Sequence, residues 1–293
     1  MPAPSLAGRK ALVTGASRGI GRAIAQRLAA AGATVVVSAR SLDNAAQAGI
    51  AGTLAETVGL IEKAGGRAIP LAADLEKASD REALVGRAAA ALGGGLDILV
   101  NNAGFAHYER VETMPVAMFD RTVDHYFKSP FVLAQAAIPF MKKAGAGWIV
   151  NIGSSEAQPP IRPYLDHNKL GGGVIYGAIK AALARFTQGL AAELVDSNIA
   201  VNLVAPSGAI RTPGADRLIP KDFPCEDVEY LAETVLAMCH LPASERTGLI
   251  THSMHFPRAV NLEVYTLDGK GRMPPAAEPQ WGHPLIRPDG IYP

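Results

Sequence analysis

The chain contains little cysteine and no long apolar segment. Cys225 and Cys239 are the only cysteines among 293 residues, so a disulfide framework is excluded, and their spacing matches no zinc motif. No run of about 18 apolar residues is present, and we therefore expect no membrane span. Residues 1–10 lack the apolar stretch of a signal peptide. These absences predict a cytoplasmic protein without a metal site.

The chain also lacks an excess of charge of either sign. There are 28 Lys and Arg against 27 Asp and Glu, which gives a formal net charge of +1. No global field attracts nucleic acid or an anionic membrane, so we expect neither as a partner. Hydrophobic residues make up 48% of the chain, which is enough for a large core.

Short apolar runs alternate with longer, alanine-rich segments of helical character. The pattern predicts strands at residues 11–14, 34–39, 67–72, 98–101, 148–152, 200–204 and 249–253. It predicts helices near residues 21–31, 53–63, 79–92, 119–143, 176–195 and 227–240. Strands that are apolar throughout are typical of a sheet covered on both faces. We therefore predict an α/β fold with a doubly wound, Rossmann-type parallel sheet, which binds ligands at the carboxyl ends of its strands.

Three segments interrupt the alternation of strands and helices. Residues 41–52 and 158–173 are rich in polar residues, Gly or Pro and are expected to be loops. Residues 256–293 are rich in Pro, Gly and charge, with little periodicity. We predict one Rossmann-type domain over residues 1–255 that holds both the cofactor and catalytic sites. The remaining 256–293 would form an irregular C-terminal extension and not a separate domain.

A glycine-rich loop follows the first predicted strand and opens the first helix. Gly15, Gly19 and Gly21 follow the pattern Gly-x3-Gly-x-Gly, which differs from the common G-x-G-x-x-G dinucleotide fingerprint. Glycines allow a tight turn and a close approach to a pyrophosphate, which the helix N-terminus would bind. A plain turn remains the alternative, but its place after the first strand favours a phosphate site.

The end of the second predicted strand indicates which nicotinamide cofactor is bound. An NAD site places a carboxylate there, to bind the ribose 2′-hydroxyl. This chain has Ala39 followed by Arg40, and Arg18 lies in the glycine loop. Arginine binds phosphate in a bidentate manner, so the two side chains favour NADP(H), unless both are simply solvated.

These motifs resemble the short-chain dehydrogenase/reductase family over roughly residues 8–253. The resemblance rests on the glycine loop, on Asn101-Asn102-Ala103-Gly104, on Ser154, and on the Y-x3-K pair Tyr176 and Lys180. It implies a homodimer or homotetramer and a nicotinamide cofactor. The residues that it assigns to the cofactor are Gly15, Ser17, Arg18, Gly19, Ile20, Gly21, Arg40, Asp74, Leu75, Asn102, Ala103, Gly104, Tyr176, Lys180, Pro206, Gly208 and Thr212. Asp74 as a cap, and Asn102 and Thr212 as turn residues, remain structural alternatives.

The catalytic interpretation rests on Ser154, Tyr176 and Lys180. Tyr176 is the only tyrosine with a lysine four residues later, a spacing that puts both side chains on one helix face. A cation near a phenol favours the phenolate and lowers its pKa. Tyr176 would donate a proton to the carbonyl oxygen or accept one from the alcohol, Lys180 would assist it, and Ser154 would orient the reacting oxygen.

The sequence departs from the family pattern at two places. Tyr126 stands where the family has an asparagine that holds a water of the proton relay. Ser154 and Tyr176 are 22 positions apart, several more than is usual, and the surplus falls in the 158–173 segment beside the expected substrate opening. Phe105, His107 and Tyr108 suggest that this opening is partly apolar.

The sequence thus predicts an NADP(H)-dependent oxidoreductase that interconverts a ketone or aldehyde and an alcohol. A nucleotide-binding sensor or scaffold on the same fold, with little or no turnover, is the alternative that Tyr126 favours. Dehydration or epimerisation of an activated sugar is a third possibility, but it normally needs a larger C-terminal domain than residues 256–293 provide.

Overall fold

The computed structural model describes residues 4–40, 42, 51–105, 107–216, 219–279 and 282–292. Within them, seven strands form one parallel sheet in the order β3-β2-β1-β4-β5-β6-β7. The strands are β1 (Lys10–Thr14), β2 (Thr34–Ala39), β3 (Arg67–Ala72), β4 (Ile98–Asn101), β5 (Gly147–Ile152), β6 (Ile199–Ala205) and β7 (Ile250–His252). Every predicted strand is present within two residues of its expected bounds, and the Rossmann-type fold class is confirmed.

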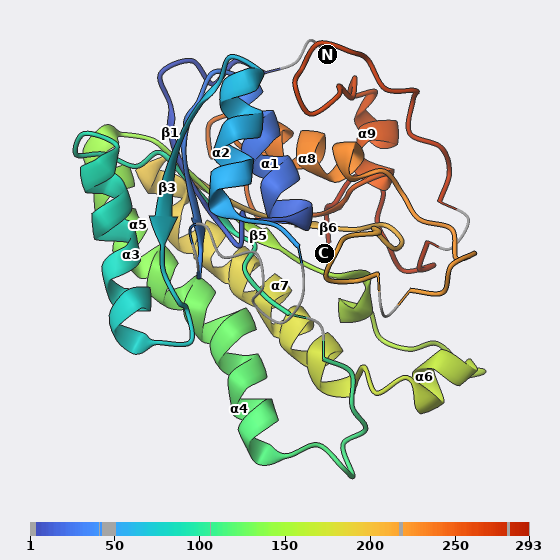
Figure 1. Ribbon diagram of the computed structural model, residues 1–293. Coiled ribbons are helices and arrows are strands. Elements are labelled where there is room, and N and C mark those ends of the chain that lie inside the picture. The colour runs from blue at the N-terminus through green and yellow to red at the C-terminus, as the bar shows by residue number, and fades with distance from the viewer. Residues whose placement is uncertain are drawn as a thin grey trace.

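Helices cover both faces of the sheet, as Figure 1 shows. One buried cluster joins the sheet to α1 (Gly19–Ala30), α2 (Leu54–Lys63), α8 (Val228–Ala237) and α9 (His255–Val260). The cluster on the other face includes α3 (Ala78–Ala91), α5 (Ser129–Ala144) and α7 (Val174–Leu194). Because central strands are enclosed by both layers, β4 and β6 are buried along their whole length. The edge strand β3 is more open and accommodates Pro70, which cannot donate to a neighbouring strand.

Three segments contain helical structure that the sequence pattern did not predict, and one of them is α9, which occupies the start of the extension that was expected to be irregular. The loop expected over 158–173 contains α6 (Asp166–Leu170), which projects from the body of the protein in Figure 1. The single helix expected over 119–143 consists of α4 (Val116–Val123), a π-helical turn (Asp124–Lys128) and α5. Apolar periodicity detects the helical segment but not a change in its hydrogen-bonding pattern. The loop expected over 41–52 lies mostly outside the described residues.

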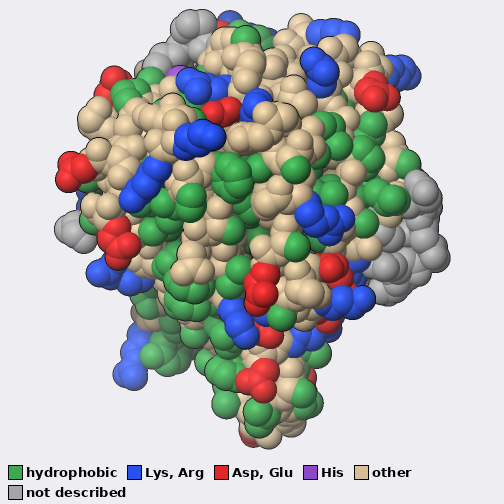
Figure 2. Space-filling view, turned by 90° about the vertical axis from the view of Figure 1, so that its left-hand side faces the viewer, with side chains coloured by type: hydrophobic (Ala, Val, Ile, Leu, Met, Phe, Trp, Pro, Cys, Tyr) green, Lys and Arg blue, Asp and Glu red, His purple; other side chains and the backbone are tan. Residues whose placement is uncertain are grey.

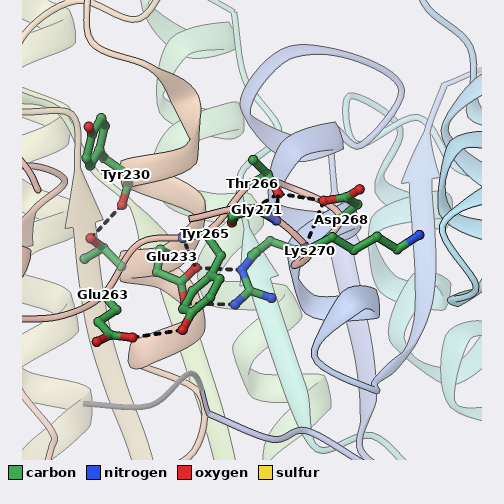
Figure 3. A network of polar contacts seen from close by, with 10 residues as sticks. Tyr230, Glu233, Glu263, Tyr265, Thr266, Asp268, Lys270 and Gly271 are labelled. Atoms are coloured by element: carbon green, nitrogen blue, oxygen red, sulfur yellow. Dashed lines mark hydrogen bonds and ion pairs between the residues drawn. The ribbon is translucent and has the colours of Figure 1, made fainter. Parts of the chain in front are cut away.

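The C-terminal extension lies on the domain from which it emerges. Glu233 on α8 accepts hydrogen bonds from the Arg27 guanidinium on α1 and from the backbone N–H of Tyr265 (Figure 3). Further along, the carbonyl of Gly290 accepts from the N–H of Ile250, so the extension covers part of the open edge of β7. Within the described residues, no helix is long and apolar enough to span a membrane.

Candidate active site

The glycine loop leaves no room for side chains between β1 and α1. Gly15 has φ +66°, and a Cβ on it would lie 2.8 Å from the Cα of Ala103. A Cβ on Gly21 would lie 2.3 Å from the carbonyl oxygen of Gly15. Both contacts are too short for any other residue. Glycine at these two positions therefore lets the loop lie close against the residues that follow β4.

Asn102 holds the glycine loop against the end of β4. Its side-chain amide donates to the carbonyl of Thr14 at 2.8 Å and to that of Gly15 at 3.3 Å. The Thr14 hydroxyl accepts from the N–H groups of Asn102 and Ala103. The structure therefore gives Asn102 and Thr14 a supporting role, in which they hold the glycine loop against the end of β4.

Two distant segments meet at the other side of the glycine loop. A Cβ on Gly19 would lie 3.2 Å from the Cβ of Thr212, so the segment after β6 closes over the loop. Ser207, between Pro206 and Gly208, is buried and bonded through its hydroxyl to Nδ1 of His255 at 2.8 Å. These contacts bring the segment after β6 to the same edge of the sheet as the glycine loop.

Positive charge collects at the end of β2. The pKa of Arg18 is lowered by burial and by the neighbouring Arg40 and Arg22 guanidinium groups. Arg22 is paired with Glu56 at 2.7 Å, while Arg40 lies 3.9 Å from Glu76. Arg18 and Arg40 therefore lie close enough at the carboxyl end of β2 for their charges to interact.

Asp74 and Leu75 follow β3 at the adenine end of the predicted cofactor site. One oxygen of Asp74 accepts from the N–H of Glu76 at 3.2 Å, so the turn-capping alternative is present in the structure. Leu75 is buried at the base of the same segment. The structure thus shows Asp74 as a cap of the turn that follows β3.

Ser154, Tyr176 and Lys180 converge beyond the end of β5. A hydrogen bond joins Ser154 to the phenolic oxygen of Tyr176. Lys180 lies one turn further along α7, is 5% exposed, and donates to the carbonyl of Ile152 at 2.7 Å. The extra residues between Ser154 and Tyr176 therefore loop outward through α6 and leave the three side chains together.

Burial dominates the ionisation of the tyrosine and the lysine. It raises the pKa of Tyr176 to about 12, although the hydrogen bond from Ser154 acts in the opposite direction. It lowers the pKa of Lys180 to about 7. The protein by itself therefore keeps Tyr176 as a neutral phenol near neutral pH, and the lowered tyrosine pKa that the sequence suggested is not a property of these residues alone.

Tyr126 fills the space beside the catalytic pair. Its ring packs edge-on against Tyr176 with centroids 5.3 Å apart, and the Lys180 ammonium lies 4.3 Å from its centroid. Its hydroxyl donates to the carbonyl of Phe105, and a Cβ on Gly104 would collide with the ring. Tyr126 belongs to the π-helical turn, a feature that often occurs at functional sites. The Lys180 side chain therefore lies in cation–π contact with the Tyr126 ring.

The comparison with known proteins identifies the family. A family model for short chain dehydrogenases matches residues 9–222. The chain belongs to the short-chain dehydrogenase/reductase family. Human dehydrogenase/reductase SDR family member 4 is 37% identical over 208 residues, which are 71% of this chain and 68% of the relative.

Solved structures of similar chains contain both nicotinamide cofactors. A structure from Beutenbergia cavernae, described as an NAD(P)-dependent gluconate 5-dehydrogenase with bound NADP, is 27% identical with a TM-score of 0.72; the match covers 85% of this chain and 96% of that one. A 7α-hydroxysteroid dehydrogenase in complex with NADH and 7-oxoglycochenodeoxycholic acid is 31% identical with a TM-score of 0.72, covering 85% and 93%. The choice of cofactor must therefore be argued from this chain's own residues.

The described part of the chain also contains a buried polar cluster around Glu226 that the sequence did not predict. Glu226 accepts hydrogen bonds from the N–H of Ser207 at 3.1 Å and from the Ser253 hydroxyl at 2.7 Å. Burial raises the pKa of this carboxyl to about 7. Glu226 and His255 lie in segments without a motif, and only folding brings them to Ser207. Among the described residues, no group of His, Cys, Asp and Glu side chains is arranged to hold a metal ion.

Proposed function

We propose that this oxidoreductase uses NADP(H) to interconvert a ketone or aldehyde and an alcohol, with Tyr176 as proton donor and acceptor. The observation that carries the proposal is the group formed by Ser154, Tyr176 and Lys180 at the carboxyl end of β5, on the edge of the sheet that also holds the glycine cradle. The bound cofactor would supply or accept the hydride.

The protonation state of the site suits reduction of a carbonyl group. With its pKa raised by burial, Tyr176 carries a proton near neutral pH and can give it to the carbonyl oxygen. Ser154, bonded to the phenol, would orient that oxygen. Lys180, whose pKa of about 7 lies near physiological pH, can return a proton towards the tyrosine. In the oxidative direction, charge on Lys180 would favour the phenolate that removes the alcohol proton.

The charge at the end of β2 supports NADP(H) over NAD(H). Arg18 and Arg40 lie close enough for their charges to interact, and a 2′-phosphate between them would relieve this repulsion. Glu76 lies beyond Arg40 and is also bonded to Arg121 at 2.6 Å. Glu76 is paired closely with Arg121, whereas Arg40 lies 3.9 Å from it. Of these two arginines, Arg40 is therefore the more available to bind a phosphate.

Aromatic side chains favour a partly apolar substrate. The rings of Tyr108 and Tyr126 lie 5.4 Å and 5.3 Å from that of Tyr176, and Phe105 lies next to Tyr126. Gly172 of the 158–173 segment accepts a hydrogen bond from the N–H of Glu109, so this segment closes against the loop that carries Tyr108. A carbonyl compound with an apolar body fits these surroundings.

The proposal is tested by single-turnover reduction of an accepted ketone with NADPH. Tyr176→Phe keeps the ring and its packing but removes the proton, so the rate should fall by about 10²–10⁴-fold while NADPH affinity is retained. Ser155→Ala, which changes the neighbouring serine, is the control and should reduce at close to the wild-type rate. Equal rates for Tyr176→Phe and wild type would contradict the mechanism. Cofactor binding without turnover of any ketone or alcohol in the wild type would favour the sensor or scaffold alternative.

A further inference from the structure

Glu226 joins the two ends of the loop that connects β6 to α8. The loop leaves β6 after Ala205 and enters α8 at Val228. Ala209 and Cys225 pair in a single parallel bridge, and the N–H of Glu226 donates to the carbonyl of Ala209 at 2.9 Å. These contacts bring the side chain of Glu226 beside the first residues of the loop, 19 positions earlier in the chain.

Three hydrogen-bond donors hold the Glu226 carboxylate. The N–H groups of Ser207 and Gly208 both donate to it. The Ser253 hydroxyl, directly after β7, lies 2.7 Å from one carboxylate oxygen and 2.8 Å from the other. Ser207 and Ser253 are 1% and 0% exposed, so both are shielded from water. An ionised carboxylate accepts at both oxygens, and here it fixes the orientation of the peptide groups that donate to it.

The residues that Glu226 holds begin the segment expected to contact the cofactor. The family pattern assigns Pro206, Gly208 and Thr212 to the cofactor. A Cβ on Gly208 would meet no heavy atom of the described residues within 4 Å, so the segment borders open space there. Four positions further along, Thr212 closes on the glycine loop, where a Cβ on Gly19 would lie 3.2 Å from its Cβ. The orientation of the first peptide groups therefore influences where the rest of this short segment lies.

Glu226 is also the group of this cluster whose charge changes near neutral pH. Burial raises the pKa of its carboxyl to about 7 and the neighbouring Asp227 adds to this, whereas its hydrogen bonds act in the opposite direction. On the other side of Ser207, the hydroxyl accepts from the N–H of Met254 at 2.9 Å and lies 2.8 Å from Nδ1 of His255 on α9. Burial lowers the pKa of His255, so its imidazole is neutral at pH 7.

We propose that Glu226 is a positioning residue for the nicotinamide cofactor, whose carboxylate orients Ser207 and Gly208 so that segment 206–212 closes over the glycine loop. This role rests on the cofactor site of the proposed function and adds to it a residue outside the motifs of the sequence. On protonation, one oxygen of Glu226 becomes a donor and a poorer acceptor, so the three hydrogen bonds weaken. Cofactor affinity therefore falls as the pH is lowered through about 7.

Glu226→Gln tests the role of the charge, because glutamine has the shape of the protonated acid. Fluorescence titration at pH 8.5 and at pH 6 measures the dissociation constants of NADPH and NADH. At pH 8.5 the variant should bind both cofactors about tenfold more weakly than wild type, because it lacks the charge that strengthens the hydrogen bonds. At pH 6 the wild type is itself mostly protonated, so the ratio should fall to about twofold. Lys180 titrates in the same interval, but it is present in both proteins and cancels in the ratio.

Two further variants complete the test. Glu229→Gln makes the same change in the first turn of α8 and should leave the ratio near one at both pH values. Ser253→Ala removes a hydrogen bond that lowers the pKa of Glu226, so the pH at which NADPH affinity falls should move upward. This shift keeps the test valid if Glu226→Gln does not fold.

Three outcomes would overturn the proposal. They are an unchanged NADPH dissociation constant for Glu226→Gln at pH 8.5, the same weakening at both pH values, and an unshifted pH dependence in Ser253→Ala. Equal weakening at both pH values would show lost packing instead of a lost charge. Failure of the Tyr176 mechanism would leave these dissociation constants unaffected, because binding is measured without turnover. Equal wild-type affinities for NADPH and NADH would refute the choice of NADP(H) but not the role of Glu226, which concerns the half that both cofactors share.

Discussion

Lys180 is a buried lysine, and its burial disfavours the charged form of the side chain. Its ammonium group gains a hydrogen bond to Ile152 and the face of Tyr126, yet burial lowers its pKa from 10.5 to about 7. Tyr176 experiences the same burial with the opposite sign, because its charged form is the anion. At the residue scale, the site thus favours a neutral phenol and a lysine that titrates near neutral pH.

The first prediction concerns the pH dependence of stability at Lys180. Between pH 7 and 10.5 the unfolded chain binds a proton that the folded chain does not, so the free energy of unfolding should rise with pH through this interval. Lys180→Met removes the titration. At pH 6 the free energy of unfolding of the variant should exceed that of the wild type by a few kcal/mol, less whatever the lost hydrogen bond to Ile152 contributes. The difference between the two proteins should be smaller at pH 9.5. Urea unfolding at both pH values measures it, with exposed Lys63→Met as the control. If the difference in free energy of unfolding between wild type and Lys180→Met is the same at both pH values, the pKa of Lys180 is not lowered.

The second prediction concerns cofactor choice at Arg40. A charge-assisted hydrogen bond contributes about 1.5–3 kcal/mol, so Arg40→Asp should weaken NADP(H) by about tenfold or more and leave NAD(H) nearly unchanged. Fluorescence titration with both cofactors measures the two dissociation constants. Arg67→Asp, at the opposite end of the strands, makes the same change of charge and should affect both cofactors little. Equal wild-type affinities for the two cofactors would refute the assignment.

At the scale of elements, a buried ion pair joins the two helices that pack on one sheet face. Arg27 of α1 and Glu233 of α8 are 206 positions apart, and their side chains are 3% and 0% exposed. Glu233 also accepts from Tyr265, so the same carboxylate fixes the C-terminal extension (Figure 3). Loss of one partner of such a pair leaves the other charge buried without compensation.

Glu233→Ala should therefore destabilise the fold by about 3–5 kcal/mol. Glu56→Ala breaks the exposed pair with Arg22 in the same region and should cost at most about 1 kcal/mol. Urea unfolding monitored by circular dichroism compares the two variants under identical conditions. A loss for Glu233→Ala no larger than that for Glu56→Ala would mean that the buried pair does not hold α1, α8 and the extension together.

At the scale of the whole molecule, charges of both signs are interspersed over the face seen in Figure 2, in keeping with the balanced composition. The outer surface of α5 and α7 has a different character. Phe131 of α5 is 46% exposed and its ring lies 6.4 Å from that of Phe186 on α7, which also contacts Phe127. An exposed aromatic side chain that packs on half-buried rings of two helices is compatible with a surface that pairs with a second copy.

Phe131→Glu should accordingly convert the expected homo-oligomer to a smaller species, since a two-fold interface would bring two new carboxylates together. Light scattering after size-exclusion chromatography measures the mass in solution. Leu60→Glu introduces the same group at a similarly exposed apolar residue on α2 and should leave the mass unchanged. A monomeric wild type, or an unchanged mass for Phe131→Glu, would contradict the prediction.

The sequence by itself determined the sheet, the helices that cover it and the order of the cofactor and catalytic motifs. Apolar runs and glycine spacing are local properties, so β1–β7 and the loop at Gly15 could be identified without tertiary structure. The sequence identified Tyr126 as a departure from the family pattern, but it did not predict the contact between Tyr126 and Lys180.

Only the tertiary structure decided the relations between residues that lie far apart in the chain. The pKa values of Tyr176 and Lys180 depend on burial by packed elements, which no local pattern records. Tyr292 accepts a hydrogen bond from Gln158, which lies 134 positions earlier, and the chain near Tyr292 has no periodicity that indicates where it lies. The helix α6 formed where Pro and Gly predicted a loop, because five residues between those breakers suffice for one turn. Contacts at long sequence separation arise from folding, and they set the charge states of Tyr176 and Lys180.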